Sequence, residues 1–211
     1  MPDKPNEPDA FLLAEYNTLS QIEISRNDRL DRFITLFMTI AGAPFAVYSF
    51  VLGKEGQANL LSMPGPVACL FLLASVLGFL IVMIIVQIRL NIILYVRAAN
   101  AIRGHFSRNS VISHALLLPG NPRVPPYYEG GKHTQQTVIA MALVNALYLG
   151  LAAYSLLRLP PYWHLSIAGV LALVFFFAHL KYYSGAANNR ESKDHGPGKL
   201  HFHKPEQHSA R

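Results

Sequence analysis

The sequence predicts an all-α fold: a four-helix transmembrane bundle whose first and second helices extend into a cytoplasmic antiparallel hairpin. Three observations predict it: long windows without charge, basic residues that gather on one side of those windows, and helical periodicity that continues beyond two of them. Of the 211 residues, 52% are apolar and only 14% are charged, against roughly 25% charged in a soluble domain. Windows without Asp, Glu, Lys or Arg occupy residues 33–52, 66–88, 137–157 and 162–180. Each has about 20 residues, enough to cross roughly 30 Å of hydrocarbon as a helix.

The first helix is expected to begin after a disordered N-terminus, 1–9. The opening stretch MPDKPNEPDAF lacks the basic region, apolar core and cleavage site of a signal peptide, so we expect the first span to stay as an anchor. Residues 10–32 are predicted to form a cytoplasmic amphipathic helix that continues into transmembrane helix 1, 33–52. Pro44 removes one backbone donor in the middle of this span and predicts a bend, for which we favour a static kink over a moving hinge.

The second helix follows an external loop, 53–65, and is predicted to outlast its membrane span. Transmembrane helix 2 occupies 66–88, but the helical pattern continues to residue 106. In this continuation the polar residues share one arc of about 120° on a helix: Arg89, Arg97, Asn100 and Arg103. Such amphipathicity is typical of a helix beside a partner in water, so 89–106 is predicted to be a cytoplasmic extension.

The acids of the first helix are predicted to pair with the arginines of the second. With Arg32 placed level with Arg89, an antiparallel alignment brings Arg97 to the level of Glu23 and Arg103 between Glu15 and Glu23. Arg89 then meets Asp28 and Asp31. The resulting interpretation is a zipped hairpin. Two independently solvated helices, or helices lying on the membrane surface, are the alternatives. The predicted structural ion pairs involve Arg89, Arg97, Arg103, Glu15, Glu23, Asp28 and Asp31.

A cytoplasmic loop rich in Pro and Gly, 107–136, is predicted to lead to the third span. Its stretch PGNPRVPPYYEGG excludes regular structure, which favours a stiff return loop; a polyproline ligand at Pro122–Pro125 is the alternative. Transmembrane helix 3, 137–157, carries small residues at helical spacing, which let backbones approach closely: Ala142, Ala146, Gly150 and Ala153. This stripe faces either another span or a second subunit. Asn145 is expected to hydrogen-bond to a neighbouring helix.

The last elements are an external turn, 158–161, transmembrane helix 4, 162–183, and a cytoplasmic tail, 184–211, that is expected to be disordered. His179 lies near the predicted cytoplasmic end of this helix, so we interpret it as an interface residue rather than a proton relay. Cys69, the only cysteine, is expected to be a small buried packing residue.

The positions of Lys and Arg predict the orientation of the chain. Of the 18 Lys and Arg residues, all but Lys54 and Arg158 fall on one side of the predicted spans. That side is expected to be the cytoplasm, with both termini there and the chain in the plasma (inner) membrane. The formal charge of +6 then follows from topology and from attraction to anionic lipid. We therefore expect no nucleic-acid partner.

No motif in the sequence predicts catalysis, and we expect no catalytic, cofactor-binding or metal site. GGKH does not fit a phosphate-binding loop, and H-E-x-x-H, G-x-S-x-G and paired-cysteine patterns are missing from the sequence. An enzyme would have to depend on His105, His114 or His133. The tail histidines could bind a transition metal opportunistically, although a solvated tail is the interpretation that we favour: His195, His201, His203 and His208.

Two stretches, EYNTLSQIEISRNDRLDRFITLFMTIAG and NAIRGHF, carry a resemblance to known proteins. An E-Y-x-x-L helix with repeated Arg runs into an apolar span, and a second span ends in N-x-I-R-x-x-F. In this, residues 10–106 resemble a group of small, mostly uncharacterised bacterial multi-span membrane proteins and are similar to the two-span SLATT effectors. That resemblance implies a hairpin of spans with cytoplasmic helices and a pore-forming activity, and it implies no catalytic residues. This chain departs from the two-span pattern by adding two further spans and a long tail.

Together these observations predict a non-enzymatic integral membrane protein that presents its cytoplasmic hairpin as an interaction or sensory module. An oligomeric pore-forming or membrane-disrupting effector, gated through the cytoplasmic stalk, is the alternative. The expected partners are the lipid bilayer, further copies of the chain, and a cytoplasmic protein or ligand.

Overall fold

The computed structural model of the chain describes residues 7–55, 65–109, 123–128, 133–157 and 161–194. Within these residues the chain forms four α-helices and no strand: α1 (Glu7–Glu55), α2 (Gly65–Asn109), α3 (His133–Leu156) and α4 (Pro161–Asp194). Proline stands in the first turn of α1, α2 and α4, where its missing N–H would have no partner within the helix. The predicted all-α class with four long helices is confirmed.

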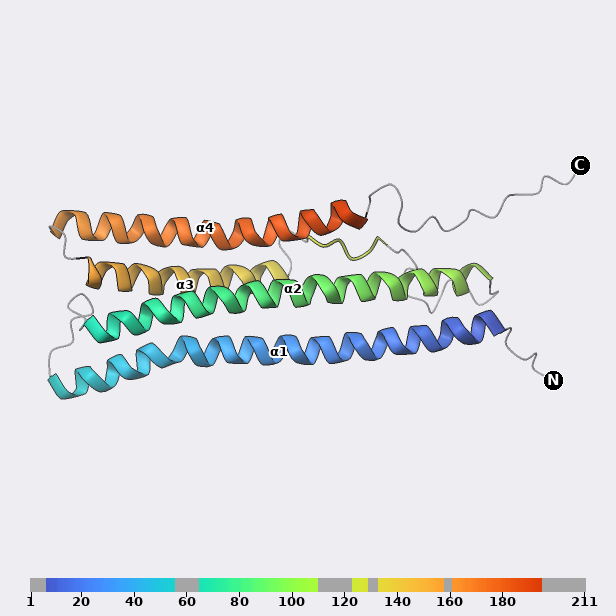
Figure 1. Cartoon of the computed structure of the whole chain (residues 1–211), viewed down its shortest axis with the longest axis horizontal. Coiled ribbons are helices and arrows are strands. Elements are labelled where there is room, and N and C mark those ends of the chain that lie inside the picture. The colour runs from blue at the N-terminus through green and yellow to red at the C-terminus, as the bar shows by residue number, and fades with distance from the viewer. Residues whose placement is uncertain (1–6, 56–64, 110–122, 129–132, 158–160, 195–211) are drawn as a thin grey trace, which may run out of the picture.

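The four helices lie side by side with their axes nearly aligned (Figure 1). Helix α2 is central: it packs against α1 on one side and against α3 on the other, and it also touches α4. Helix α3 packs against α4 as well. The start of α1, the end of α2 and the end of α4 all lie at the same end of the molecule, beyond the start of α3 (Figure 1).

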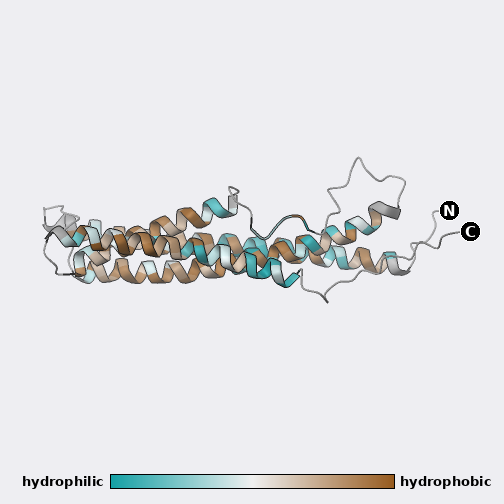
Figure 2. Cartoon of the chain, turned by 90° about the horizontal axis from the view of Figure 1, so that it is seen from above, coloured by the Kyte–Doolittle hydropathy of each residue, from teal (hydrophilic) through white to brown (hydrophobic). Residues whose placement is uncertain are grey.

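Each of the four helices, within the described residues, contains a stretch that is long and apolar enough to cross a membrane. Apolar side chains from α1, α2 and α3 fill the interior, including Phe37, Phe71, Val82 and Val138. The outer surface at the same level is also apolar, with large exposed residues such as Leu73, Leu80, Leu173 and Phe177. Apolar residues dominate the part of the bundle that holds all four helices, and polar residues gather toward the end where both termini lie (Figure 2). A bundle that is apolar inside and outside is compatible with a multi-pass membrane protein.

Helix α1 bends where Pro44 interrupts its hydrogen bonding. Pro44 is buried within α1, and the cyan end of the helix inclines away from its blue part (Figure 1). The hydroxyl of Tyr148 in α3 donates a hydrogen bond to the carbonyl of Ala41, one turn before the proline. The rings of Phe45 and Tyr148 also meet edge to face, with centroids 5.5 Å apart. Neighbouring groups therefore support the bent segment, as a membrane helix that contains proline requires.

Several predicted boundaries differ from the structure. Helix α4 runs on to Asp194, so the prediction that a disordered tail begins at residue 184 is wrong. The loop predicted at 107–136 is shorter at both ends, because α2 reaches Asn109 and α3 begins at His133. Cys69 is exposed on α2 and is not the buried packing residue that we expected. The tail histidines, Pro122 of the P-x-x-P motif and most of the predicted external loop lie outside the described residues.

Candidate functional site

Arg97 is the centre of a polar cluster at the end of the bundle where α1 and α2 extend beyond α3. Its guanidinium donates from Nε to the carbonyl of Pro125 at 2.8 Å and from Nη2 to Oε2 of Glu191 at 2.8 Å. Its Nη1 lies 3.5 Å from Oδ2 of Asp194. Only 7% of Arg97 is exposed. A planar, permanently charged fork can satisfy these acceptors at once, which a single ammonium could not do.

The loop residues 123–128 are bound to α2 through their backbone carbonyls. The prolines of this loop lack backbone N–H donors, so the described loop residues form no regular backbone hydrogen bonding among themselves. Asn100 lies three residues after Arg97 and therefore shares its side of α2. Its Nδ2 donates to the carbonyl of Val124 at 2.8 Å, beside the bond from Arg97 to Pro125. The segment expected to be only a stiff return loop is thus part of this cluster.

Tyr127 connects the loop to α4. Its ring lies under Arg97, whose Cζ is 4.1 Å from the ring centroid, a cation–π contact. Its hydroxyl donates to Oδ2 of Asp194 at 2.5 Å, and 1% of the residue is exposed. Burial, reinforced by the hydrogen bond to Asp194, raises the pKa of Tyr127 to about 12. The phenol therefore stays protonated near neutral pH and keeps its donor role.

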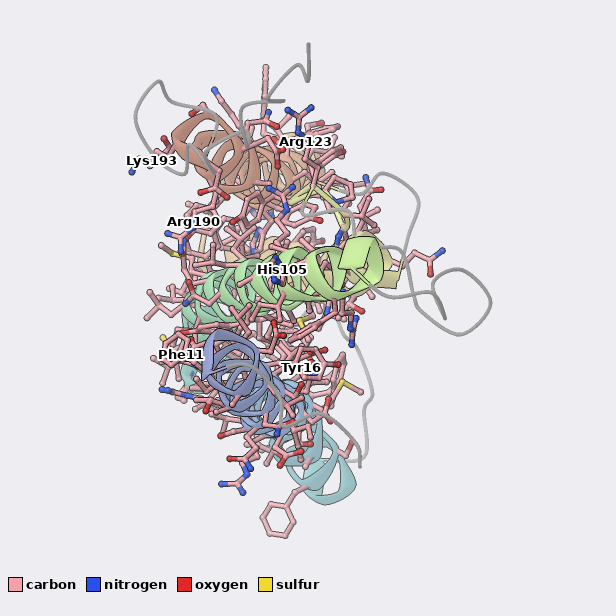
Figure 3. All side chains as sticks on the ribbon, turned by 90° about the vertical axis from the view of Figure 1, so that its right-hand side faces the viewer. Phe11, Tyr16, His105, Arg123, Arg190 and Lys193 are labelled. Atoms are coloured by element: carbon pink, nitrogen blue, oxygen red, sulfur yellow. The ribbon has the colours of Figure 1, made fainter. Side chains whose placement is uncertain are left out.

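The same network reaches α1 through Arg103. This side chain donates from Nη1 to Oδ1 of Asn100 at 3.0 Å. Its Nη2 donates to the hydroxyl of Tyr16 at 2.6 Å, and its Cζ lies 5.2 Å from the centroid of the Tyr16 ring. Further along, Nε2 of His105 lies 3.8 Å from Oδ1 of Asp9. Figure 3 looks along the bundle from this end, with Tyr16 labelled on α1 and His105 on the neighbouring α2. Hydrogen bonds and ion pairs thus connect α1, α2, loop 123–128 and the end of α4. We use the name Arg97 cluster for the connected residues: Tyr16, Arg97, Asn100, Arg103, the loop residues 123–128, Glu191 and Asp194.

The predicted ion pairs between α1 and α2 are wrong, because the arginines of α2 have other partners. Arg97 pairs with Glu191 and Asp194 of α4 rather than with Glu23. Arg103 meets the phenol of Tyr16, the neighbour of Glu15, and not a carboxylate. Nε of Arg89 is buried without a hydrogen-bond partner among the described residues. In the part of the chain that the structure describes, no ion pair joins α2 to the four predicted acids: Glu15, Glu23, Asp28 and Asp31.

Glu191, Asp194 and Tyr127 are the residues of this cluster that the sequence interpretation missed. Glu191 and Asp194 stand three residues apart, so they share one side of a helix. That spacing was the available signal, and the expectation of a disordered tail concealed it. No sequence pattern indicated the role of Tyr127, because its contacts with Arg97 and Asp194 depend on how the loop folds back against α2 and α4.

A second polar cluster lies inside the apolar part of the bundle. Nδ2 of Asn145 in α3 donates to Nε2 of His179 in α4 at 3.1 Å, and Nδ1 of His179 donates to the carbonyl of Phe175 at 2.7 Å. Ser75 of α2 donates to the carbonyl of Asn145 at 2.8 Å. His179 is fully buried among the helices, and our interpretation that it lies near the membrane interface stays a prediction. Buried polar groups require partners, and this cluster supplies them across three helices.

Small residues let the helices approach closely around this cluster. Ala142 and Ala146 are buried in α3, and a Cβ added to Gly150 would lie 3.3 Å from Cβ of Ala172 in α4. Ala153, the last residue of the predicted stripe, is half-buried. The Gly150 contact shows that part of the stripe faces another span of the same chain.

The four apolar helices define a multi-pass helical bundle, with one polar cluster around Arg97 at its polar end and a second cluster in its apolar part. Among the described residues, no group of three or more His, Cys, Asp or Glu side chains is placed to hold a metal ion. The polar groups form hydrogen bonds and ion pairs with one another, so their evident chemistry is the joining of helices. Comparison of the chain with known protein families, with curated proteins and with solved structures gives no match.

Proposed function

We propose that this chain is a non-enzymatic integral protein of the plasma (inner) membrane that presents a cytoplasmic stalk as an interaction module. The stalk consists of α1 and α2 beyond the apolar spans, together with the rest of the Arg97 cluster. The asymmetry of Lys and Arg supports its cytoplasmic side. The Arg97 cluster supports a rigid platform, because it joins segments that are far apart in the sequence.

Exposed apolar side chains on the stalk are the observation that carries this proposal. Among the described residues, helix α1 packs mainly against α2, so they leave most of its circumference uncovered. Phe11 is 68% exposed, Leu13 55% and Ile24 63%, and all three lie before the uncharged window of α1. Leu13 and Ile24 are eleven residues apart, which places them about 20° apart around the helix. An apolar pair on one side of a water-exposed helix favours a protein partner that covers it.

Site-specific photocrosslinking in the expressing cell tests this proposal. A photoreactive phenylalanine analogue at Ile24 is expected to give a discrete crosslinked product, and the additional change Leu13→Asp is expected to abolish it. The matched control carries the analogue at Ser25, the exposed neighbour that points to another side of α1, and is expected to give no product. Absence of a product at Ile24, or a product that survives Leu13→Asp, would overturn the proposal.

The pore-forming or membrane-disrupting effector is the alternative function. Phe71, Val82, Asn145 and His179 are almost completely buried and occupy the interior of the bundle. A conducting path would therefore have to form between copies of the chain, and a second copy could also cover Leu13 and Ile24. A crosslinked product of twice the chain mass, together with loss of membrane potential after induced expression, would favour this alternative.

A further inference from the structure

A groove with a basic wall on α4 lies between α2 and α4, at the level where the uncharged window of α2 ends. The groove is lined by polar residues of both helices: Gln87 of α2, and Lys181, Tyr182, Asn189, Arg190 and Lys193 of α4. Leu90, Gly185 and Ala186 complete the lining. Gln87 and Leu90 flank Arg89, the first charged residue after the window. The groove therefore lies at the expected headgroup level of the leaflet that faces the stalk.

Two hydrogen bonds hold the walls of this groove together. Nε2 of Gln87 donates to the hydroxyl of Tyr182 at 3.1 Å. Nη2 of Arg190 donates to Oδ1 of Asn91 at 3.1 Å. Because the two bonds lie at different levels, α2 and α4 are fixed beside each other along the groove. The groove is thus a built feature and does not depend on an exposed loop.

The charge of the groove has one sign. All three charged residues in its lining are cationic, namely Lys181, Arg190 and Lys193. The nearby carboxylates of α4, Glu191 and Asp194, already contact Arg97 and Tyr127, although Asp194 lies one helical turn after Arg190. Arg190 and Lys193 project to the same side of α4, away from Arg123 (Figure 3). A groove whose charged lining residues are all cations, two of them one turn apart at Arg190 and Lys193, favours an anionic occupant.

The surroundings of the groove fit a lipid. No heavy atom lies within 4 Å of the position that a Cβ of Gly185 would occupy, so the α4 backbone is open to the groove. Lys181 is exposed, and its apolar stem can lie along the span while its ammonium reaches the headgroup level. Leu80 and Ile84 are exposed on the same side of α2 as Gln87, where acyl chains would lie.

We propose that this groove binds the headgroup of an anionic phospholipid from the leaflet that faces the stalk. Lys181, Arg190 and Lys193, which are spread over about 18 Å of α4, attract the anionic headgroup along the groove, and Asn189 supplies a hydrogen-bond donor. Basic grooves between transmembrane helices are suited to such headgroups. A bound lipid would bridge α2 and α4 close to the Arg97 cluster. This binding does not depend on the protein partner proposed for α1.

Native mass spectrometry of the full chain in detergent micelles tests the proposal with dioleoyl phosphatidylglycerol and dioleoyl phosphatidylcholine as probes. The native chain is expected to retain phosphatidylglycerol in preference to phosphatidylcholine. The double variant Lys181→Gln/Lys193→Gln leaves the Arg190–Asn91 bond in place. It is expected to bind phosphatidylglycerol about 25-fold more weakly, since each cation near a headgroup contributes about fivefold.

The control variant Arg26→Gln/Arg29→Gln removes the same charge from α1 and is expected to retain phosphatidylglycerol as the native chain does. Equal losses in the two variants would overturn the proposal, because binding would then follow net charge and not the groove. Equal retention of the two lipids by the native chain would also overturn it. Displacement of phosphatidylglycerol by equimolar inorganic phosphate would assign the groove to a free anion and refute the lipid assignment.

Discussion

At the scale of single residues, Arg97 determines the polar end of this molecule. Its guanidinium contacts the carbonyl of Pro125, two carboxylates of α4 and the ring of Tyr127. A lysine could keep the charge, but its ammonium could not meet the carbonyl and both acids in the same geometry. Hydrogen bonds that involve charged groups contribute about 1.5–3 kcal/mol each, so loss of one is enough to loosen the loop.

The variant Arg97→Lys is therefore expected to release the loop 123–128 from α2 and α4. Trypsin should cleave after Arg123 at least about tenfold faster than in the native chain, because cleavage follows the open population and 1.4 kcal/mol corresponds to tenfold. The rate is measured by the appearance of the corresponding fragment from protein in detergent micelles. Arg32→Lys, at an exposed position of α1, should leave the rate unchanged. Equal cleavage rates in Arg97→Lys and the native chain would show that the planar guanidinium of Arg97 is not needed to hold the loop 123–128.

At the scale of the elements, α2 and α3 approach each other closely at a glycine. Asn145 of α3 lies directly over Gly78 of α2, so a Cβ at Gly78 would come within 2.1 Å of Oδ1 of Asn145. The glycine is required here because the amide of Asn145 must reach His179. Helix–helix association in lipid relies on such small residues and on interhelical hydrogen bonds.

Replacement Gly78→Ala is accordingly expected to push α2 and α3 apart and to lower the free energy of unfolding by about 1–3 kcal/mol. Unfolding by dodecyl sulfate in mixed micelles measures this quantity. Gly169→Ala in α4 is the matched control, since no heavy atom lies within 4 Å of its Cβ position. The control should be as stable as the native chain or slightly more stable. A Gly78→Ala protein as stable as the Gly169→Ala protein would contradict the proposed close contact.

At the scale of the whole molecule, the arrangement of the helices places the polar ends together. The start of α1, the end of α2 and the end of α4 lie at one end, and the start of α2 lies at the other (Figure 1). Among the residues that the structure describes, the basic side chains other than Lys54 belong to the parts of the helices and loop toward the first of these ends. If that end is cytoplasmic, as the distribution of Lys and Arg predicts, the start of α2 faces the outside.

Cysteine labelling in intact cells checks this orientation in a Cys69→Ser background. A membrane-impermeant maleimide is expected to label Gly65→Cys, at the exposed start of α2, and not Ser192→Cys, at the exposed end of α4. Permeabilised cells should show labelling at both positions. Labelling of Ser192→Cys alone in intact cells would reverse the orientation, and with it the side of the membrane on which the proposed partner and lipid bind.

The sequence by itself determined the class of this protein, since hydrophobicity and length decide whether a segment can cross a membrane. The four uncharged windows, and the small residues of the third span, could be identified from the sequence alone. The partners of Arg97, Arg103 and His179 were decided only by the tertiary structure. Pairing depends on the rotation of each helix about its axis and on which helix lies next to it. The sequence interpretation paired α2 with α1 alone, whereas the structure brings α4 and the loop 123–128 against the same side of α2. Those contacts keep the polar end of α4 helical although its composition predicts disorder.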